Sequence, residues 1–156
     1  MSRKILVAFD DSENAMRAVE YVAGLLSKDC RITLFSVVQD TASICDMQSP
    51  ELTPYFKSQQ DSFCVLEEKK KQILSAAQAK AKAILTAGGF PDDRIRIKSE
   101  PKKKGIARDI VTEAQTGYDL VVLGRRGLAG IREFFMGSVS QKVLSLAQEL
   151  PILIVS

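Results

Sequence analysis

Five short apolar runs, separated by segments with helical spacing, constrain the fold of this chain more than any other sequence feature. They lie at residues 5–9, 32–38, 95–97, 120–123 and 151–155. The first and fourth runs are continuously apolar, as expected of strands buried on both faces of a parallel sheet. The third alternates with charged residues, which is typical of an edge strand. The alternation of strands and helices predicts an α/β protein with a five-stranded parallel Rossmann-like sheet, helices on both faces and right-handed crossovers.

The segments between these runs predict the helices. A first helix should begin at Ser12, which is a suitable N-cap, and end near residues 27–29. Three further helices are expected at residues 63–86, at residues 106–116, and from Gly137-Ser138 onward. Residues 39–61 are polar and contain Pro50 and Pro54, so we interpret them as a long loop with at most a short helical turn.

Length and charge limit the organisation of the chain and its partners. At 156 residues, the chain has the size of one domain, which we expect to span residues 1–156. The net charge of +3 does not suggest the basic stripe of a dedicated nucleic-acid binder. No apolar run approaches the roughly 20 residues that cross a membrane, and the N-terminus shows no signal-peptide pattern. We therefore expect neither a nucleic-acid partner nor a membrane partner.

The cysteines and the lack of histidine limit the chemistry. Cys30, Cys45 and Cys64 show no metal-ligand spacing. We interpret them as plain thiols, with redox sensing by Cys45 and Cys64 as the alternative. An odd number of cysteines is typical of a reducing compartment, which predicts a cytoplasmic location. Because the chain has no histidine, Ser–His–Asp and Cys–His catalysis are excluded, and acid–base work would fall to carboxylates or lysines.

The candidate site lies where the strands end. If the first and fourth strands are central neighbours, Asp10 and Gly124 face the same crevice at the carboxyl edge of the sheet. Glycines allow a ligand to approach the backbone closely, and the free N–H groups of a helix that begins at Gly137-Ser138 favour a phosphate. A carboxylate such as Asp10 can accept from a ribose hydroxyl or help to hold a divalent cation.

These residues alone leave two interpretations open. Gly124 could simply end a strand, and Gly137-Ser138 could simply cap a helix. The spacing fits neither the GxxxxGK[ST] motif nor the GxGxxG motif of standard phosphate-binding loops. From the residue types alone, nucleotide binding and a purely structural role for the glycines therefore remain alternatives.

The wider pattern resembles a known family. Gly124-x-x-Gly127-x9-Gly137-Ser138 matches the G-2x-G-9x-G-(S/T) nucleotide motif of the universal stress protein (UspA-like) family in its ATP-binding branch. The start of the chain from Ile5 to Asp10, the segment from Asp119 to Gly124 and the closing strand also resemble that family. The resemblance covers essentially the whole chain, and residues 39–61 resemble it least.

The resemblance implies a fold of the adenine nucleotide alpha hydrolase-like type, a homodimer built through the C-terminal strand, and ATP bound with Mg²⁺ or Mn²⁺. It places Asp10 and Val37 near the adenosine and Gly124 near the ribose. It places the phosphates on the following residues: Gly127, Gly137, Ser138 and Val139. Family members commonly have a small hydroxyl residue at the position of Arg125, so this chain departs from the pattern there.

Three functions are compatible with this sequence. The first is a nucleotide-dependent regulatory or stress-response protein with little or no turnover, because no residue is evident that would orient an attacking water. The second is a slow ATPase or a nucleotidyl-transfer enzyme, for which residues 39–62 would have to supply a second substrate pocket. The third is an interaction module that binds a protein partner and no nucleotide.

Overall fold

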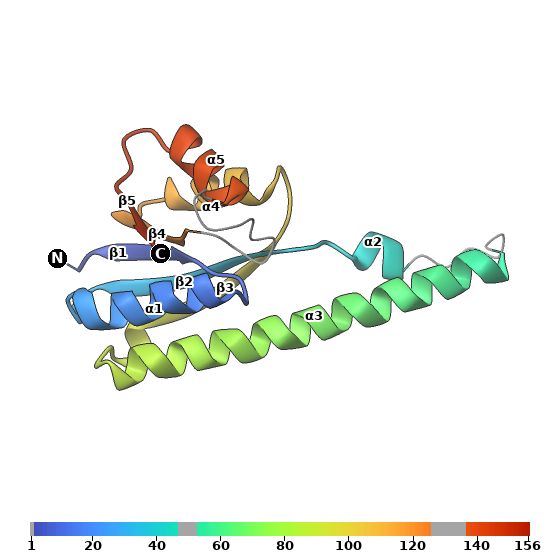
Figure 1. Ribbon diagram of the computed structural model, residues 1–156, viewed down its shortest axis with the longest axis horizontal. Coiled ribbons are helices and arrows are strands. Elements are labelled where there is room, and N and C mark those ends of the chain that lie inside the picture. The colour runs from blue at the N-terminus through green and yellow to red at the C-terminus, as the bar shows by residue number, and fades with distance from the viewer. Residues whose placement is uncertain (1, 47–52, 126–136) are drawn as a thin grey trace.

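The computed structural model describes residues 2–46, 53–125 and 137–156, and within them five strands form one parallel sheet. The strands are β1 (Lys4–Ala8), β2 (Arg31–Val38), β3 (Ile95–Pro101), β4 (Leu120–Gly124) and β5 (Ile152–Val155). Their order in the sheet is β3-β2-β1-β4-β5 (Figure 1). The condition that β1 and β4 are neighbours is met, and the prediction that β3 is an edge strand is confirmed.

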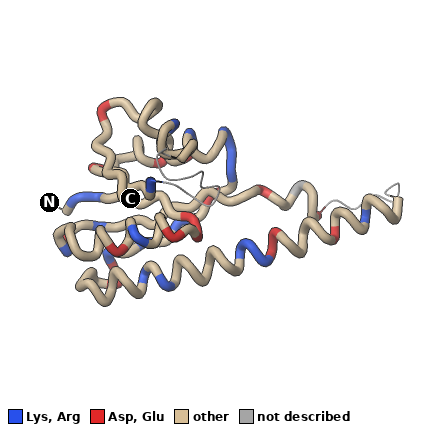
Figure 2. The backbone as a smooth tube through the Cα atoms, viewed as in Figure 1, with Lys and Arg blue, Asp and Glu red and all other residues tan. Residues whose placement is uncertain are grey.

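Helices cover both faces of this sheet, as predicted (Figure 1). They are α1 (Glu13–Leu25), α2 (Ala42–Cys45), α3 (Pro54–Ala87), α4 (Ile106–Ala114) and α5 (Ser138–Leu146), with a short 3-10 turn at Asp92–Arg94. Helices α1 and α3 pack on one face, and α4 and α5 on the other. Figure 2 shows basic and acidic residues interspersed along the described chain rather than collected in one stripe.

The pleat of β1 explains why its sequence is continuously apolar. Ile5 and Val7 join the core beneath α1 and α3, whereas Leu6 joins the core beneath α4 and α5. Successive side chains on a strand point to opposite faces, so a strand covered on both faces needs apolar residues at every position. All three side chains are buried.

The start of α1 also follows the prediction. The Ser12 hydroxyl accepts a hydrogen bond from the Ala15 N–H (3.1 Å), so Ser12 caps the helix. Helix α1 ends at Leu25 and α4 at Ala114, each two residues before the predicted end.

The predicted start of the third helix is wrong. Helix α3 begins at Pro54, nine residues before the predicted Phe63. Proline is well tolerated in the first turn, where its missing N–H would have no helical partner, and the Thr53 hydroxyl caps the helix by accepting from the Phe56 N–H (3.4 Å). The added turns are largely exposed, so they lack the apolar periodicity that reveals a packed helix.

One buried amide fixes the position of α3 on the sheet. The Gln78 Nε2 donates to the Ser36 hydroxyl of β2 (3.1 Å) and to the Ser99 hydroxyl of β3 (3.0 Å). The Ser36 hydroxyl in turn donates to the Phe9 carbonyl (2.7 Å), at the end of β1. The chain of hydrogen bonds satisfies polar groups that would be costly to bury unpaired.

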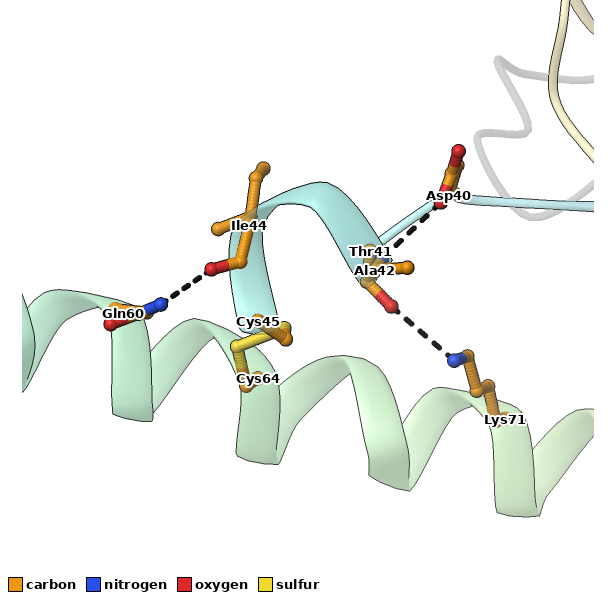
Figure 3. The surroundings of a disulfide bond; sticks show 8 residues. All are labelled: Asp40, Thr41, Ala42, Ile44, Cys45, Gln60, Cys64 and Lys71. Carbon is orange, nitrogen blue, oxygen red and sulfur yellow. Dashed lines mark hydrogen bonds between the residues drawn. A yellow bond between two sulfur atoms is a disulfide. The ribbon is translucent and has the colours of Figure 1, made fainter. Parts of the chain in front are cut away.

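The interpretation of Cys45 and Cys64 as plain thiols is also wrong, because a disulfide joins them and links α2 to α3 (Figure 3). The Lys71 Nζ reinforces the link by donating to the Thr41 hydroxyl (3.3 Å). The sequence did not reveal this pairing, because the predicted helix began at Phe63 and placed Cys64 at its N-terminal end. In the structure Cys64 lies well inside α3, next to α2. Cys30 is a buried free thiol. An odd number of cysteines by itself indicates a reducing compartment. Because two of the three cysteines form a disulfide, that indication no longer holds, and the cytoplasmic location stays a prediction.

Candidate functional site

A cavity of about 120 Å³ lies at the carboxyl ends of the central strands, between the sheet and the helices α4 and α5. It is lined by Ala8, Phe9, Asp10, Phe35, Val37, Ile106, Ile110, Leu123, Gly124, Val139 and Ser140. The chain runs outward from β1 to β2 and β3 on one side and to β4 and β5 on the other. The cavity therefore occupies the switch point of the sheet, where ligands of open α/β proteins bind.

The walls of this cavity are mostly apolar, and its polar groups are few. Phe35 and Leu123 contribute from the strands, and Ile106 and Ile110 contribute from α4. Polar side chains come from Asp10 and Ser140. An apolar cavity with a small number of polar groups is typical of a site for a small molecule or a cofactor.

Asp10 lies two residues after the end of β1, and a local hydrogen bond fixes its orientation. Its Oδ1 accepts from the Ser12 N–H (2.9 Å), at the residue that caps α1. Within the described residues, no three histidine, cysteine or acidic side chains lie close enough to hold a metal ion together. Mg²⁺ at phosphate sites is usually bound by one or two carboxylates together with phosphate oxygens and water, and Asp10 offers one carboxylate at the cavity.

The N-terminus of α5 supplies donors beside the cavity. The Gly137 N–H donates to the Arg125 carbonyl (2.8 Å), and the first helical bond runs from the Gln141 N–H to the Gly137 carbonyl (3.0 Å). The N–H groups of Ser138, Val139 and Ser140 have no acceptor among the described residues. Free N–H groups at the positive end of a helix dipole favour an anion such as a phosphate.

A second contact ties α5 to the end of β4. The Ser140 hydroxyl is buried and donates to the Gly124 carbonyl (2.8 Å). This bond holds the first turn of α5 against β4, so it fixes the helix N-terminus relative to Asp10, which follows the neighbouring strand β1.

Gly124 has a packing role besides its place at the cavity. A β-carbon at position 124 would lie 2.9 Å from the carbonyl oxygen of Asn14 and 3.1 Å from the Ala15 nitrogen. Real β-carbons essentially never come this close to backbone atoms. Glycine is therefore required for the end of β4 to pack against the first turn of α1, whatever the cavity binds.

The structure brings together most of the residues that the sequence analysis selected. Asp10, Val37, Gly124 and Val139 line one cavity, and Gly137 and Ser138 begin the helix at its side. Gly127 lies outside the described residues. Several further lining residues were not predicted as site residues from the sequence, namely Phe35, Ile106, Ile110, Leu123 and Ser140. These side chains have ordinary core periodicity, and only their position near the carboxyl edge of the sheet distinguishes them.

Comparison with known proteins decides the family. The model of the universal stress protein family matches residues 1–156. The chain belongs to this family. Two curated universal stress proteins are similar along nearly their whole length. YxiE of Bacillus subtilis is 30% identical over 156 residues, which cover 99% of each chain. A universal stress protein of Thermus aquaticus is 26% identical, also over 156 residues and 99% of each chain.

Solved structures of universal stress proteins share the fold. UspA from Lactobacillus plantarum has a TM-score of 0.68 and 19% identity, with 99% of this chain and 97% of that chain covered. A universal stress protein in complex with cAMP has a TM-score of 0.61 and 18% identity, with 99% and 96% covered. The predicted five-stranded α/β fold of the family is confirmed.

The lengths and polarity of the described helices can be compared with those of a membrane-spanning helix. Each of them is too short or too polar to span a bilayer.

Proposed function

We propose that this universal stress protein binds ATP and acts as a nucleotide-dependent regulatory protein of the stress response, with little or no turnover. The observation that carries the proposal is the juxtaposition of an apolar cavity at the switch point with the first N–H groups of α5, which have no acceptor among the described residues. The apolar cavity suits a ring system, and the helix N-terminus beside it suits the phosphates.

Different residues of the site would contact the adenine, the ribose and the phosphates. The adenine ring would lie against the apolar wall that includes Phe35 and Ile110, with Val37 contacting the adenosine through its backbone. Gly124 would lie by the ribose, and Asp10 would accept from a ribose hydroxyl. The phosphates would be held by the following residues of the motif: Gly127, Gly137, Ser138 and Val139.

A divalent cation fits this arrangement only as a partner of the phosphates. Asp10 offers one carboxylate at the cavity, and Mg²⁺ or Mn²⁺ would complete its coordination with phosphate oxygens and water. The bound ion would neutralise phosphate charge next to this carboxylate.

Low turnover follows from the side chains at the cavity. Among the described residues, the polar side chains that line the cavity are those of Asp10 and Ser140, and Ser140 already donates to the Gly124 carbonyl. The chain contains no histidine. Efficient hydrolysis requires a group that orients the attacking water, so binding is favoured over a slow ATPase or a nucleotidyl transferase.

The same proposal includes a homodimer through β5. This strand pairs with β4 on one side and lies at the edge of the sheet, where its other backbone groups can pair with a second chain. Three of its four side chains are half-buried, so pairing would also cover apolar surface.

Nucleotide content tests the proposal directly. The protein is purified without added ligand and denatured, and the released nucleotides are separated by chromatography. We expect ATP near stoichiometry in the wild type and its loss in Gly137→Val. The backbone of Gly137 has φ −60° and ψ 155°, which valine adopts without strain, so the substitution adds bulk at the phosphate position without forcing the chain.

The metal contact requires a second pair of variants. Asp10→Asn keeps an oxygen that can accept from Ser12 but removes the charge, so ATP binding should lose its dependence on Mg²⁺. Asp11→Asn is the matched control, because Asp11 does not line the cavity.

If neither ATP nor cAMP binds when titrated in with Mg²⁺, the nucleotide proposal fails and the interaction module becomes the better interpretation. Rapid phosphate release would instead favour the ATPase.

A further inference from the structure

The first part of α3 projects from the body of the molecule (Figure 1), and we name residues 54–73 the arm. The contacts of α3 with the core begin at Leu74 and include Ala77, Ala81 and Leu85. Before that point the helix is accompanied by α2, to which the Cys45–Cys64 disulfide links it. The arm nevertheless carries large apolar side chains that are more than half exposed: Tyr55, Phe56, Val65, Leu66 and Ile73.

Most of these side chains form two rows on the side of the arm that faces away from α2. The first row is Asp61, Val65 and Lys69, spaced by four residues, so that its members are neighbours on the helix surface. The second row is formed by Tyr55, Leu66 and Ile73. Its spacings of 11 and 7 residues are close to whole helical turns, which align these three side chains along the helix.

The first row is symmetric in position and opposite in charge about Val65. Asp61 lies four residues before Val65 and Lys69 four residues after it, about 6 Å away along the helix in each case. If a second copy of the arm packs antiparallel with its twofold axis at Val65, Asp61 of each copy lies opposite Lys69 of the other. A parallel arrangement would instead oppose like charges. The row is thus complementary to itself in the antiparallel direction.

The second row obeys the same symmetry. With the twofold axis at Val65, Leu66 of one copy meets Leu66 of the other near the centre. Tyr55 of one copy lies within about 3 Å, measured along the helix, of Ile73 of the other. With the twofold axis at Val65, each row of one arm therefore lies opposite the same row of the second arm. The exposed apolar side chains of the two copies would cover one another.

The charges of the first row are available for such a contact. None of the ion pairs within the described residues uses Asp61 or Lys69, although both side chains are exposed. Figure 2 shows acidic and basic segments following one another along the arm.

We propose that the arm is an interface between two copies of this chain, paired antiparallel about Val65. This interface lies at the end of the molecule away from β5 (Figure 1), so it is separate from the β5 dimer and independent of nucleotide binding. If both interfaces form, β5 dimers associate through their arms, and association continues beyond two dimers unless the second pair of arms closes the assembly. One helix pair buries less than the roughly 800 Å² per partner of a typical stable complex, so we expect weak association.

Charge exchange tests this pairing. Sedimentation equilibrium is measured from about 1 μM to about 1 mM, the range in which a weak interface becomes populated. We expect wild type to reach at least about twice the mass of Asp61→Lys or Lys69→Asp at high concentration, because each single variant opposes like charges across the twofold axis. The double variant Asp61→Lys/Lys69→Asp should regain the wild-type mass, and so should an equal mixture of the two single variants.

Two further variants control this experiment. Lys80→Asp reverses an exposed charge on the same helix beyond the arm and should leave the mass unchanged. Leu66→Glu places a charge in the second row and should prevent association even in the charge-exchanged double variant. All variants should keep the helical circular dichroism and the nucleotide content of wild type. The proposal is overturned if wild type and the single variants have equal masses throughout, or if neither the double variant nor the mixture recovers.

Discussion

Gly124, at the end of β4, packs closely against Asn14 in the first turn of α1. A β-carbon on Gly124 would lie 2.9 Å from the carbonyl carbon and 2.9 Å from the carbonyl oxygen of Asn14. Gly124→Ala must therefore move the strand or the helix. We expect it to lower the free energy of unfolding by about 1–3 kcal/mol, as is usual when atoms are added to a closely packed site. Urea unfolding in the absence of nucleotide measures this effect.

Gly24→Ala is the matched control for that substitution. Gly24 lies within α1, and a β-carbon there would meet nothing within 4 Å. Alanine is a better helix former than glycine, so this variant should be more stable by about 0.5–1 kcal/mol. Equal stability of Gly124→Ala and wild type without ligand would show that the close approach is relieved at no cost.

The Gln78 amide, which bridges Ser36 and Ser99, should be a major determinant of how α3 sits on the sheet. Gln78→Leu keeps a similar volume but leaves the Ser99 hydroxyl without its donor in a partly buried site. We expect a loss of about 1–3 kcal/mol in the free energy of unfolding. Gln72→Leu, an exposed change on the same helix, should stay within about 0.5 kcal/mol of wild type. Similar losses in both variants would argue against a role for the buried amide.

The strands were predictable because the physics that buries them also determines their sequence. A strand such as β1 is covered on both faces and must be apolar at Ile5, Leu6 and Val7 alike. The arm was not predictable on that basis, because its first turns are exposed and Pro54 suggests a helix break as readily as a helix start. Periodicity reports packing, so a helix without a packed face leaves little trace in it.

The candidate site was predictable where it depends on backbone and charge. Asp10, Gly124 and Gly137 stand at strand ends or at a helix start, positions that the sequence itself marks. Ile110 and Ser140 were missed, because an apolar or small buried side chain looks the same whether it lines a cavity or fills a core. The structure also gives Gly124 a packing role that spacing could not reveal.

Reduction of the Cys45–Cys64 disulfide should free α2 from the arm while leaving the sheet intact. The bond joins two peripheral elements, and beside it the Gln60 amide and the Lys71 amine donate to the Ile44 carbonyl and the Thr41 hydroxyl. We expect hydrogen exchange to rise in α2 and in the arm when a reductant is added, because local openings cost less than global unfolding.

Hydrogen exchange in the central strands is the internal reference for this experiment. Exchange in β1 and β4 should be unchanged, since these strands lie in the core, far from the disulfide in the fold. A Cys45→Ser variant should behave like the reduced protein, and Cys30→Ser should respond to reductant like wild type because Cys30 is a free thiol. Unchanged exchange in α2 upon reduction would mean that the hydrogen bonds suffice to hold it.

The pairing of Lys98 with Glu113 should make stability depend on alkaline pH. The Lys98 Nζ lies 2.5 and 2.9 Å from the two carboxylate oxygens of Glu113, whose side chain is 9% exposed. The hydrogen bond to Glu113 raises the pKa of Lys98 above its ordinary 10.5, and the charge of Glu100 adds to the effect. A raised pKa in the folded state means that the proton on Lys98 binds more tightly there than in the unfolded chain.

The contribution of this pair should therefore be complete below about pH 10.5 and decline as the pH rises through the raised pKa of folded Lys98. Lys98→Met removes the cation and leaves a nearly buried carboxylate unpaired, which should cost about 1–3 kcal/mol at neutral pH. Urea unfolding at about pH 8 and about pH 11 measures whether the difference from wild type shrinks. Lys80→Met, at an exposed position, should show no such change. A difference that stays constant across this range would indicate that Lys98 acts through packing rather than through its charge.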